Sequence, residues 1–301
     1  MNNTQNSSRR TLAAFVRLMR PHHWIKNGLI FLPLACGGQL FQSSLLKNTL
    51  LGFAAFCLIT SAVYILNDIR DKEQDRLHES KRSRPLASGA VSVRSAWVLC
   101  GLMLPGAALL AIGAGGAGLW PHLWMLLYLV INIAYSFGLK NYPVIDVIIL
   151  AAGFLLRLLY GSAVTGIEIS NWLYLTVISF SLYLGLGKRR NELSRGAKDG
   201  SPTRKVLATY SLNFLDKNMY MCLALTIAFY ALWTVDPVTA ERISGNRLVW
   251  TVPLLIVICM KYSLNVESDS HGDPVDVVLH DKVLLFLTAL FLLAVGLIVY
   301  L

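Results

Sequence analysis

The sequence predicts an all-α membrane protein, a polytopic bundle of about nine transmembrane helices. Of its 301 residues, 55% are hydrophobic, and the mean hydropathy is +0.56. That composition is too apolar for a soluble domain. Because its apolar runs are continuous rather than alternating, they exclude a β-barrel. The runs long enough to cross a bilayer lie near residues 28–45, 49–67, 95–113, 118–138, 144–163, 172–187, 218–235, 248–264 and 283–301.

The net charge of +10 is distributed unevenly along the chain. Nearly all Lys and Arg residues fall in the N-terminal tail and in the loops after the second, fourth, sixth and eighth runs. The positive-inside rule therefore places the N-terminus in the cytoplasm and the C-terminus outside. The basic residues border membrane helices and form no separate domain. They predict contact with anionic membrane lipids or phosphate, and they exclude nucleic acid as a partner.

The chain divides into a polar tail, an interfacial segment and a bundle. Residues 1–10 are polar and are expected to be disordered. Residues 11–27 contain a short amphipathic helix predicted to lie on the cytoplasmic membrane surface, with one apolar face made of Leu12, Phe15, Val16 and Met19. Residues 28–301 form the transmembrane bundle. Its long loops, 68–94 and 188–217, are predicted to be cytoplasmic and hold most of the polar clusters.

The most informative segment follows the second apolar run and includes three carboxylates. Asp68, Asp71 and Asp75 have i, i+3, i+7 spacing, so a helix would place them on one face. Like charges at that spacing repel at a membrane boundary, and a divalent cation would remove the repulsion. Oxygen ligands suit Mg²⁺, which usually bridges carboxylates to substrate phosphates. The alternative is a solvated helix face paired with nearby Lys and Arg residues.

Basic side chains follow these carboxylates directly, namely Arg76, Lys81, Arg82 and Arg84. Carboxylates followed by guanidinium groups are expected at a diphosphate site. Metal ions hold such a group on one side, and Arg side chains neutralise its outer oxygens. A positive-inside loop is the alternative, and it explains the charges but not the carboxylate spacing.

A second polar cluster includes Tyr135 and Lys140 after the fourth run, followed by Arg157. Arg157 lies well inside the fifth run, where an unpaired guanidinium is expensive. Its side chain is therefore expected to face the bundle interior and to contact a carboxylate, a carbonyl or a substrate phosphate. Structural pairing within the bundle and substrate binding both remain open for this residue.

A third cluster starts where the sixth run ends. Lys188 and Arg189 lie at the depth of a phosphate on a lipid carrier and are predicted to bind it, with Glu192 orienting them or reaching a metal. Arg204 and Tyr210 follow in the same loop. The alternative is that the basic residues only determine topology.

The motif N-D-x-x-D-x-x-x-D from Asn67 to Asp75, after the second of about nine helices, resembles the UbiA superfamily of membrane prenyltransferases. The resemblance extends over essentially the whole chain from about residue 12. Those enzymes bind diphosphate through Mg²⁺ on two Asp-rich loops. Here the second loop has a G-K-R-x-x-E segment ending at Glu192, where the family usually has an Asp-x-x-x-Asp pair. That segment, together with Y-x-F-G-L-K ending at Lys140 and K-R-x-R-P ending at Pro85, is similar to the phosphoribosyltransferase branch of the superfamily.

The resemblance implies transfer of 5-phosphoribose from phosphoribosyl pyrophosphate to a polyprenyl phosphate, with release of pyrophosphate. In the bacterial inner membrane such a product supplies arabinose donors for the cell envelope. Mg²⁺ would be held by Asp68, Asp71 and Asp75, with Asn67 as a further polar ligand. The implied catalytic residues are Asp68, Asp71, Asp75, Lys188 and Arg189. The implied substrate-binding residues are Asn67, Arg76, Lys81, Arg82, Arg84, Tyr135, Lys140, Arg157, Glu192, Arg204 and Tyr210.

Two other functions are compatible with parts of the sequence. An aromatic prenyltransferase that uses a polyprenyl diphosphate to make quinone or haem precursors would share the fold, but its second motif should be acidic. A transporter would be favoured by helices broken at matching midplane positions. In this chain the polar residues gather on one side of the membrane instead. The sequence makes no prediction of oligomeric state.

Overall fold

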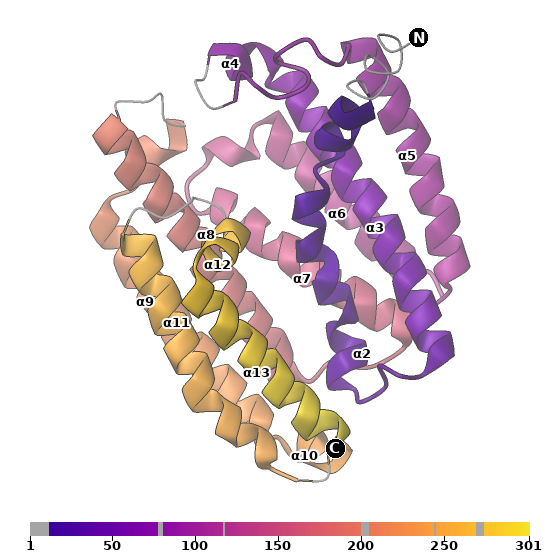
Figure 1. Ribbon diagram of the computed structural model, residues 1–301, viewed down its shortest axis with the longest axis vertical. Helices are drawn as coiled ribbons and strands as arrows, with labels where there is room; N and C mark the ends of the chain where they lie inside the picture. The colour runs from indigo at the N-terminus through magenta and orange to yellow at the C-terminus, as the bar shows by residue number, and fades with distance from the viewer. Residues whose placement is uncertain (1–11, 78–80, 117, 200–204, 244, 269–273) are drawn as a thin grey trace.

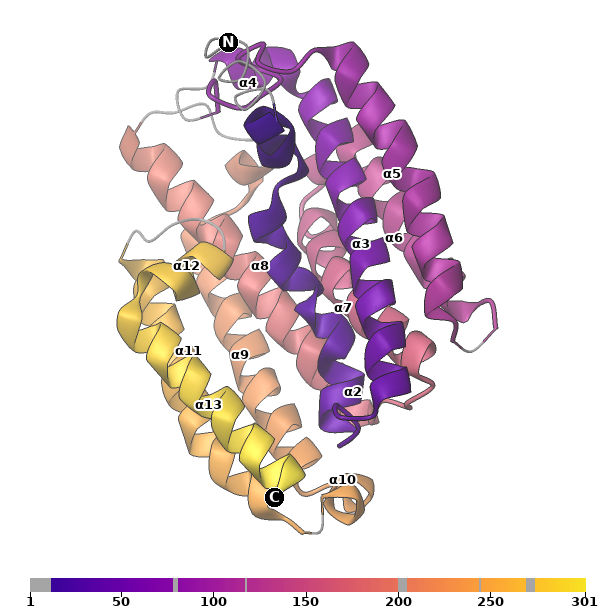
Figure 2. The ribbon, with the colours of Figure 1, turned by 45° about the vertical axis from the view of Figure 1, so that its right-hand side comes forward.

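The chain folds as a helical bundle with two adjoining groups of helices, seen in Figures 1 and 2. The computed structural model describes residues 12–77, 81–116, 118–199, 205–243, 245–268 and 274–301, and these contain helices but no strand. The first group contains η1 (Pro21–Phe31), α2 (Leu32–Cys36), α3 (Ser43–Arg70), α4 (Lys72–Leu77), α5 (Val93–Ala114), α6 (Trp120–Phe137), η2 (Leu139–Asn141) and α7 (Ile145–Thr165). The second contains α8 (Asn171–Asp199), η3 (Lys205–Thr209), α9 (Leu212–Thr234), α10 (Pro237–Arg242), η4 (Arg247–Thr251), α11 (Val252–Glu267), α12 (Pro274–His280) and α13 (Lys282–Tyr300).

The prediction of an all-helical membrane bundle is confirmed. Five of the described helical segments are long and apolar enough to cross a membrane, namely Ser43–Arg70, Val93–Ala114, Ile145–Thr165, Arg247–Glu267 and Lys282–Tyr300. The remaining apolar runs lie on α6, α8, α9 and the η1–α2 pair, which are shorter, more polar or broken. In both views α4 lies at one end of the bundle, and the C-terminus and α10 lie at the other.

The first predicted span, residues 28–45, differs from the helix that forms. Helical structure begins at Pro21 as the 3₁₀-helix η1 and ends with α2 at Cys36. Pro21 and Pro33 each occupy the first or second position of their helix, where a missing N–H costs nothing. The polar segment after Gly37 does not continue the helix, because Gly38 has a positive φ of 69°. The apolar run alone did not indicate either boundary.

The interfacial segment is helical over residues 12–19, as the sequence predicts for the start of this segment. Its buried side differs from the predicted face. Leu18 is fully buried against α3 and α5, and Phe15 and Met19 pack beside it, whereas Leu12 and Val16 are exposed. The helix therefore contacts the bundle through a face rotated from the predicted one. The apolar side chains of Leu12 and Val16 remain exposed on its other side.

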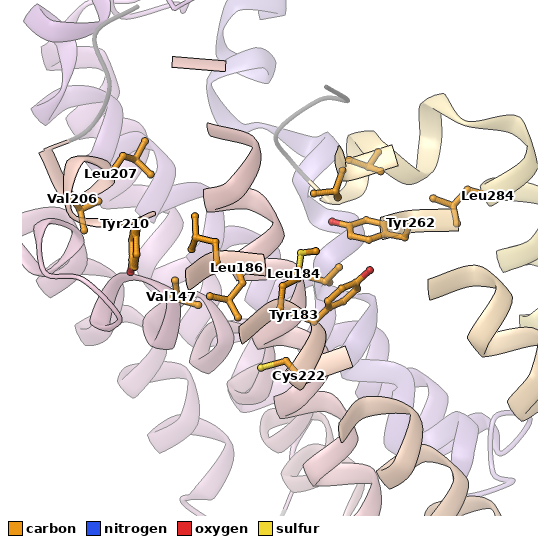
Figure 3. Close-up of a cluster of buried hydrophobic side chains, with 14 residues drawn as sticks. Val147, Tyr183, Leu184, Leu186, Val206, Leu207, Tyr210, Cys222, Tyr262 and Leu284 are labelled. Atoms are coloured by element: carbon orange, nitrogen blue, oxygen red, sulfur yellow. The ribbon is translucent and has the colours of Figure 1, made fainter. Parts of the chain in front are cut away.

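The interior contains separate hydrophobic clusters. One lies among η1, α3, α5, α6 and α7. Another, drawn in Figure 3, joins α7 to α8, η3, α9 and α11. In this second cluster Tyr210 lies beside Val147, Val206 and Leu207, so the segment after α8 is anchored onto the start of α7. This packing brings the two long predicted loops to the same end of the bundle.

Candidate active site

The Asp-rich motif lies where α3 ends and α4 begins. Asn67 and Asp68 are in the last turn of α3, Asp71 is its C-cap residue, and Asp75 is in α4. The backbone N–H of Asp71 bonds to the carbonyl of Asn67 at 2.9 Å, and that of Asp75 bonds to the carbonyl of Asp71 at 2.8 Å. These bonds keep helical spacing across the junction. The chain therefore continues from α3 into α4 with helical spacing between these residues.

Each carboxylate of the motif contacts a basic side chain. The Oδ1 atom of Asp68 lies 2.5 Å from Nη2 of Arg20 and 3.3 Å from Nη1 of Arg84. The same Arg84 nitrogen lies 2.6 Å from Oδ2 of Asp75. Because one guanidinium nitrogen reaches both carboxylates, Asp68 and Asp75 converge on a single position that carries positive charge. Both are almost fully buried, so removal of that charge would leave a strong repulsion.

Asp71 is more accessible and has a different partner. Its two carboxylate oxygens lie 3.0 and 3.1 Å from Nζ of Lys140. The neighbouring Asn67 accepts a hydrogen bond through its Oδ1 atom from the hydroxyl of Ser136. The loop after α6 therefore brings Lys140 to the motif, as the prediction of one polar site requires.

The motif offers only oxygen donors, which suit Mg²⁺. Among the residues that the structure describes, no group of three or more His, Cys, Asp or Glu side chains is placed to hold a metal ion. This arrangement fits a site in which carboxylates supply part of the coordination and substrate phosphates the rest. It does not fit an all-protein cage. Arg20 and Arg84 hold positive charge where such an ion would bind.

Arg20 is a site residue that sequence reasoning missed. It has a left-handed backbone, with a φ of 53°, immediately before Pro21, and this turn directs the chain into η1. Its side chain also lies 5.1 Å from the centre of the Tyr64 ring. Arg20 lies in the predicted interfacial segment, residues 11–27. Nothing in the local sequence indicates that its partner is a carboxylate 48 residues away.

The other basic residues of the first loop are placed differently. Arg76 bonds through Nε to the carbonyl of Ala87 at 3.1 Å and pairs with the exposed Glu73 at 3.0 Å. It therefore fastens the loop onto α4. Lys81 is partly buried and Arg82 is exposed at the same end of the bundle. Of the four predicted basic residues here, Arg84 contacts two carboxylates of the motif, Asp68 and Asp75.

The third cluster forms a buried network around Arg189. Its guanidinium is fully buried and lies 2.5 Å from Oδ2 of Asp146 and 2.6 Å from Oε2 of Glu192. It also donates to the hydroxyl of Tyr135 at 3.0 Å. Arg189 is thus enclosed by its own partners, which favours a role in holding the site together over direct phosphate binding. Lys188 beside it is only partly buried.

Tyr210 completes this network. Its hydroxyl donates to Oδ1 of Asp146 at 2.6 Å and accepts from the backbone N–H of Val144 at 2.6 Å. Burial and the bond to Asp146 raise the pKa of Tyr210 to about 12, so its hydroxyl keeps its proton near neutral pH. Arg204, predicted to lie nearby, is outside the described residues.

Arg157 lies apart, deeper in the bundle. It donates to Oδ1 of Asn27 at 2.7 Å, to the carbonyl of Gly153 at 2.5 Å and to the hydroxyl of Tyr128 at 3.1 Å. Its guanidinium also lies 5.4 Å from the centre of the Phe56 ring. Within the described part of the chain it pairs with no carboxylate. It is a buried cation held by neutral groups, a setting that attracts an anion.

The profile of the UbiA prenyltransferase family matches residues 30–278. The chain therefore belongs to the UbiA prenyltransferase family, and the predicted resemblance is confirmed. A solved UbiA homologue from Archaeoglobus fulgidus, bound to GPP and Mg²⁺, superposes with a TM-score of 0.70 at 24% identity. The match covers 96% of this chain and 100% of that one, which confirms the fold.

Two relatives carry a more specific name. The decaprenyl-phosphate phosphoribosyltransferase of Corynebacterium glutamicum is 32% identical over 293 residues, covering 95% of this chain and 86% of the relative. The protein of the same name from Mycobacterium tuberculosis is 33% identical over 292 residues, covering 95% and 94%. The predicted similarity to the phosphoribosyltransferase branch is thus confirmed over nearly the full length.

Proposed function

We propose that this protein transfers 5-phosphoribose from phosphoribosyl pyrophosphate to a polyprenyl phosphate and releases pyrophosphate. The observation that carries the proposal is the buried Arg189, which lies at the centre of the second cluster and pairs with Asp146 and Glu192. A metal-binding second loop would instead present only carboxylates to the ion at this place. The site therefore has two poles, an acidic pole built on Asp68, Asp71 and Asp75 and a basic pole built on Lys188 and Arg189. Such a site suits a pyrophosphate leaving group at the first and a phosphate acceptor at the second.

The donor would bind at the acidic pole. Asp68, Asp71 and Asp75, with the amide oxygen of Asn67, would hold Mg²⁺, which neutralises the pyrophosphate as negative charge develops on it. Arg84, released from Asp68 and Asp75, is placed to donate to phosphate oxygens with its planar fork. Lys140 can likewise move from Asp71 to a phosphate oxygen, because its ammonium group is a compact charge on a flexible side chain.

The acceptor phosphate would bind near Lys188, at the membrane depth of the predicted cytoplasmic boundary. An oxygen of this phosphate forms the new bond to C1 of the ribose. The bond from C1 to the pyrophosphate oxygen breaks, and its electron pair leaves with pyrophosphate. A phosphate monoester is already ionised at neutral pH, so no strong general base is needed. Positioning of the two substrates therefore supplies much of the rate.

The proposed orientation follows from charge. Loops 68–94 and 188–217 and the N-terminal residues face the cytoplasm, where a soluble donor is available, and the C-terminus faces outside. The polyprenyl tail remains in lipid and enters between helices. The catalytic unit is the transmembrane bundle of residues 28–301, preceded by the interfacial segment. The bacterial inner membrane is the proposed location.

The proposal is tested with purified protein in detergent, Mg²⁺ and a polyprenyl phosphate. One reaction receives radiolabelled phosphoribosyl pyrophosphate, and a second receives a labelled polyprenyl diphosphate with 4-hydroxybenzoate. We expect label in the lipid phase from phosphoribosyl pyrophosphate and no prenylated 4-hydroxybenzoate. The reverse result would assign the chain to the aromatic prenyltransferases, whose first motif it shares.

A further inference from the structure

Residues 135–146, here called the clamp segment, join the end of α6 to the first turn of α7. This segment contacts both poles of the candidate site, the acidic pole from its middle and the basic pole from its two ends. Toward the acidic pole, Ser136 donates to Asn67, and Lys140 pairs with Asp71 at 3.0 Å.

Toward the basic pole, the clamp segment is held at both of its ends. The Tyr135 hydroxyl accepts from Arg189 at 3.0 Å, and Asp146 pairs with the same guanidinium at 2.5 Å. Asp146 and Arg189 are both fully buried. A buried ion pair of this kind keeps its geometry only when its remaining hydrogen bonds are also made. Tyr210 makes such a bond to the other oxygen of Asp146, at 2.6 Å.

The strained point of the clamp segment is Val144. Its φ is 69° and its ψ is −47°, a backbone conformation that a β-branched residue rarely adopts. Such a conformation persists only where the surrounding structure holds it. The hydroxyl of Tyr210 accepts the Val144 backbone N–H at 2.6 Å. Figure 3 shows the Tyr210 ring set among Val147, Val206 and Leu207, so the hydroxyl is anchored by a packed aromatic side chain.

We infer that Tyr210 is a positioning residue, which holds Val144 and Asp146 and thereby fixes Lys140 and Arg189 at a set separation across the site. This rests on the proposed function in one respect, because the separation matters for joining a donor to an acceptor. The Tyr210 hydroxyl is already bonded on both sides, so it acts through the clamp segment and does not touch substrate. This role differs from the substrate-binding role that the sequence predicts for Tyr210.

The test compares Tyr210→Phe with the double variant Tyr210→Phe/Val144→Gly in the full-length protein. Loss of the hydroxyl should let Val144 leave its strained conformation. Glycine adopts a positive φ freely, so Val144→Gly should let residue 144 keep its native backbone conformation without the Tyr210 hydroxyl. Tyr142→Phe is the matched control, because Tyr142 is an exposed tyrosine of the same segment.

Two readouts are needed. Amide hydrogen exchange over residues 135–146 should be faster in Tyr210→Phe than in the wild type and should slow again in the double variant. In the phosphoribosyl transfer assay, kcat of Tyr210→Phe should fall by about 10- to 100-fold with little change in either KM, because misplacement affects the reacting geometry. The double variant should regain part of that loss, because Val144→Gly does not replace the hydrogen bond to Asp146, and Tyr142→Phe should match the wild type.

The inference would be overturned if Tyr210→Phe had the same amide exchange rates over residues 135–146 and the same kcat as the wild type. A loss of activity that Val144→Gly does not relieve would also overturn it, since Tyr210 would then act on substrate or on Asp146 alone. If the wild type itself transfers no phosphoribose, the proposed function fails. The exchange measurement still decides whether Tyr210 holds the clamp segment, so the two failures are distinguishable.

Discussion

Three acidic side chains of the first motif are neutralised by basic partners from three separate segments. Arg20 precedes η1, Arg84 follows α4, and Lys140 lies in η2. A buried carboxylate cluster requires such compensation when no metal is bound. The same cations can move to phosphate oxygens when a divalent ion takes over the carboxylates. The arrangement therefore suits a site that alternates between protein counter-ions and a metal–phosphate substrate.

Substitution of either Asp68 or Asp71 by Asn tests this exchange. We expect transfer activity to fall by about 100-fold or more, because the developing charge on the leaving group loses its support. The protein should still fold, since the amide keeps a hydrogen-bonding oxygen for Arg20 or Lys140. Activity is measured by transfer of label to lipid, and folding by thermal unfolding in detergent.

Glu73→Gln is the matched control for these variants. Glu73 lies in α4 and falls between Asp68 and Asp75 in the sequence. Its side chain is 74% exposed and pairs only with Arg76 among the described residues. We expect Glu73→Gln to keep wild-type activity. Near-normal turnover in both Asp68→Asn and Asp71→Asn would contradict the metal site.

Sequence reasoning succeeded at residue scale where spacing was local. The local spacing agrees with the approach of Asp68 and Asp75, which both contact Nη1 of Arg84, and helical bonds continue from α3 into α4. Asp71 contacts Lys140 instead, so the common face of all three carboxylates stays a prediction. Sequence reasoning missed Arg20, because an ion pair between segments 48 residues apart leaves no local pattern. For Arg189 the sequence indicated the membrane depth, but burial and pairing with Asp146 depend on how α7 and α8 pack.

At the scale of elements, η1 and α7 approach each other closely at Gly161. A Cβ atom added at Gly161 would lie 2.2 Å from the carbonyl oxygen of Ile30. Only glycine permits this contact. The approach places Asn27 of η1 against Arg157 of α7 at 2.7 Å and keeps η1 along α3. An eleven-residue 3₁₀-helix is unusual, and its packing against these two helices supports it.

Gly161→Ala should therefore destabilise the protein by about 1–3 kcal/mol, because an overpacked backbone contact must open. The measurement is the denaturation midpoint of the purified protein in a mild detergent. Gly101→Ala in α5 is the control, since a Cβ there meets nothing within 4 Å. That control should be neutral or should stabilise by up to about 1 kcal/mol. Equal midpoints for Gly161→Ala and the wild type would contradict the close packing of η1.

The sequence predicted elements better in the middle of the chain than at its start. The second apolar run, 49–67, lies inside α3, and the fifth, 144–163, nearly coincides with α7. The first run was misplaced because η1 carries polar residues, among them the buried Asn27, which lower its hydropathy. The side chain of Asn27 is satisfied by contacts with α3 and α7 that no hydropathy pattern contains.

At the scale of the whole molecule, α4 and α10 lie at opposite ends of the bundle in Figure 1. The proposed orientation therefore places them on opposite sides of the membrane. Single cysteines replacing Glu73 and Asn246 in a Cys36→Ala background test this. Both positions are exposed, and the other four native cysteines are buried. In intact cells a membrane-impermeant maleimide should label Asn246→Cys, and Glu73→Cys should react only after lysis. The opposite pattern would invert the proposed orientation.

In the proposed reaction, phosphoribose moves to the lipid while pyrophosphate leaves. This is tested with phosphoribosyl pyrophosphate that carries ¹⁴C in the ribose and ³²P in the β-phosphate. With Mg²⁺ and a polyprenyl phosphate, we expect ¹⁴C in the lipid phase and an equal amount of ³²P released as aqueous pyrophosphate. Transfer of ³²P to lipid, or lipid-phase ¹⁴C without release of pyrophosphate, would contradict it.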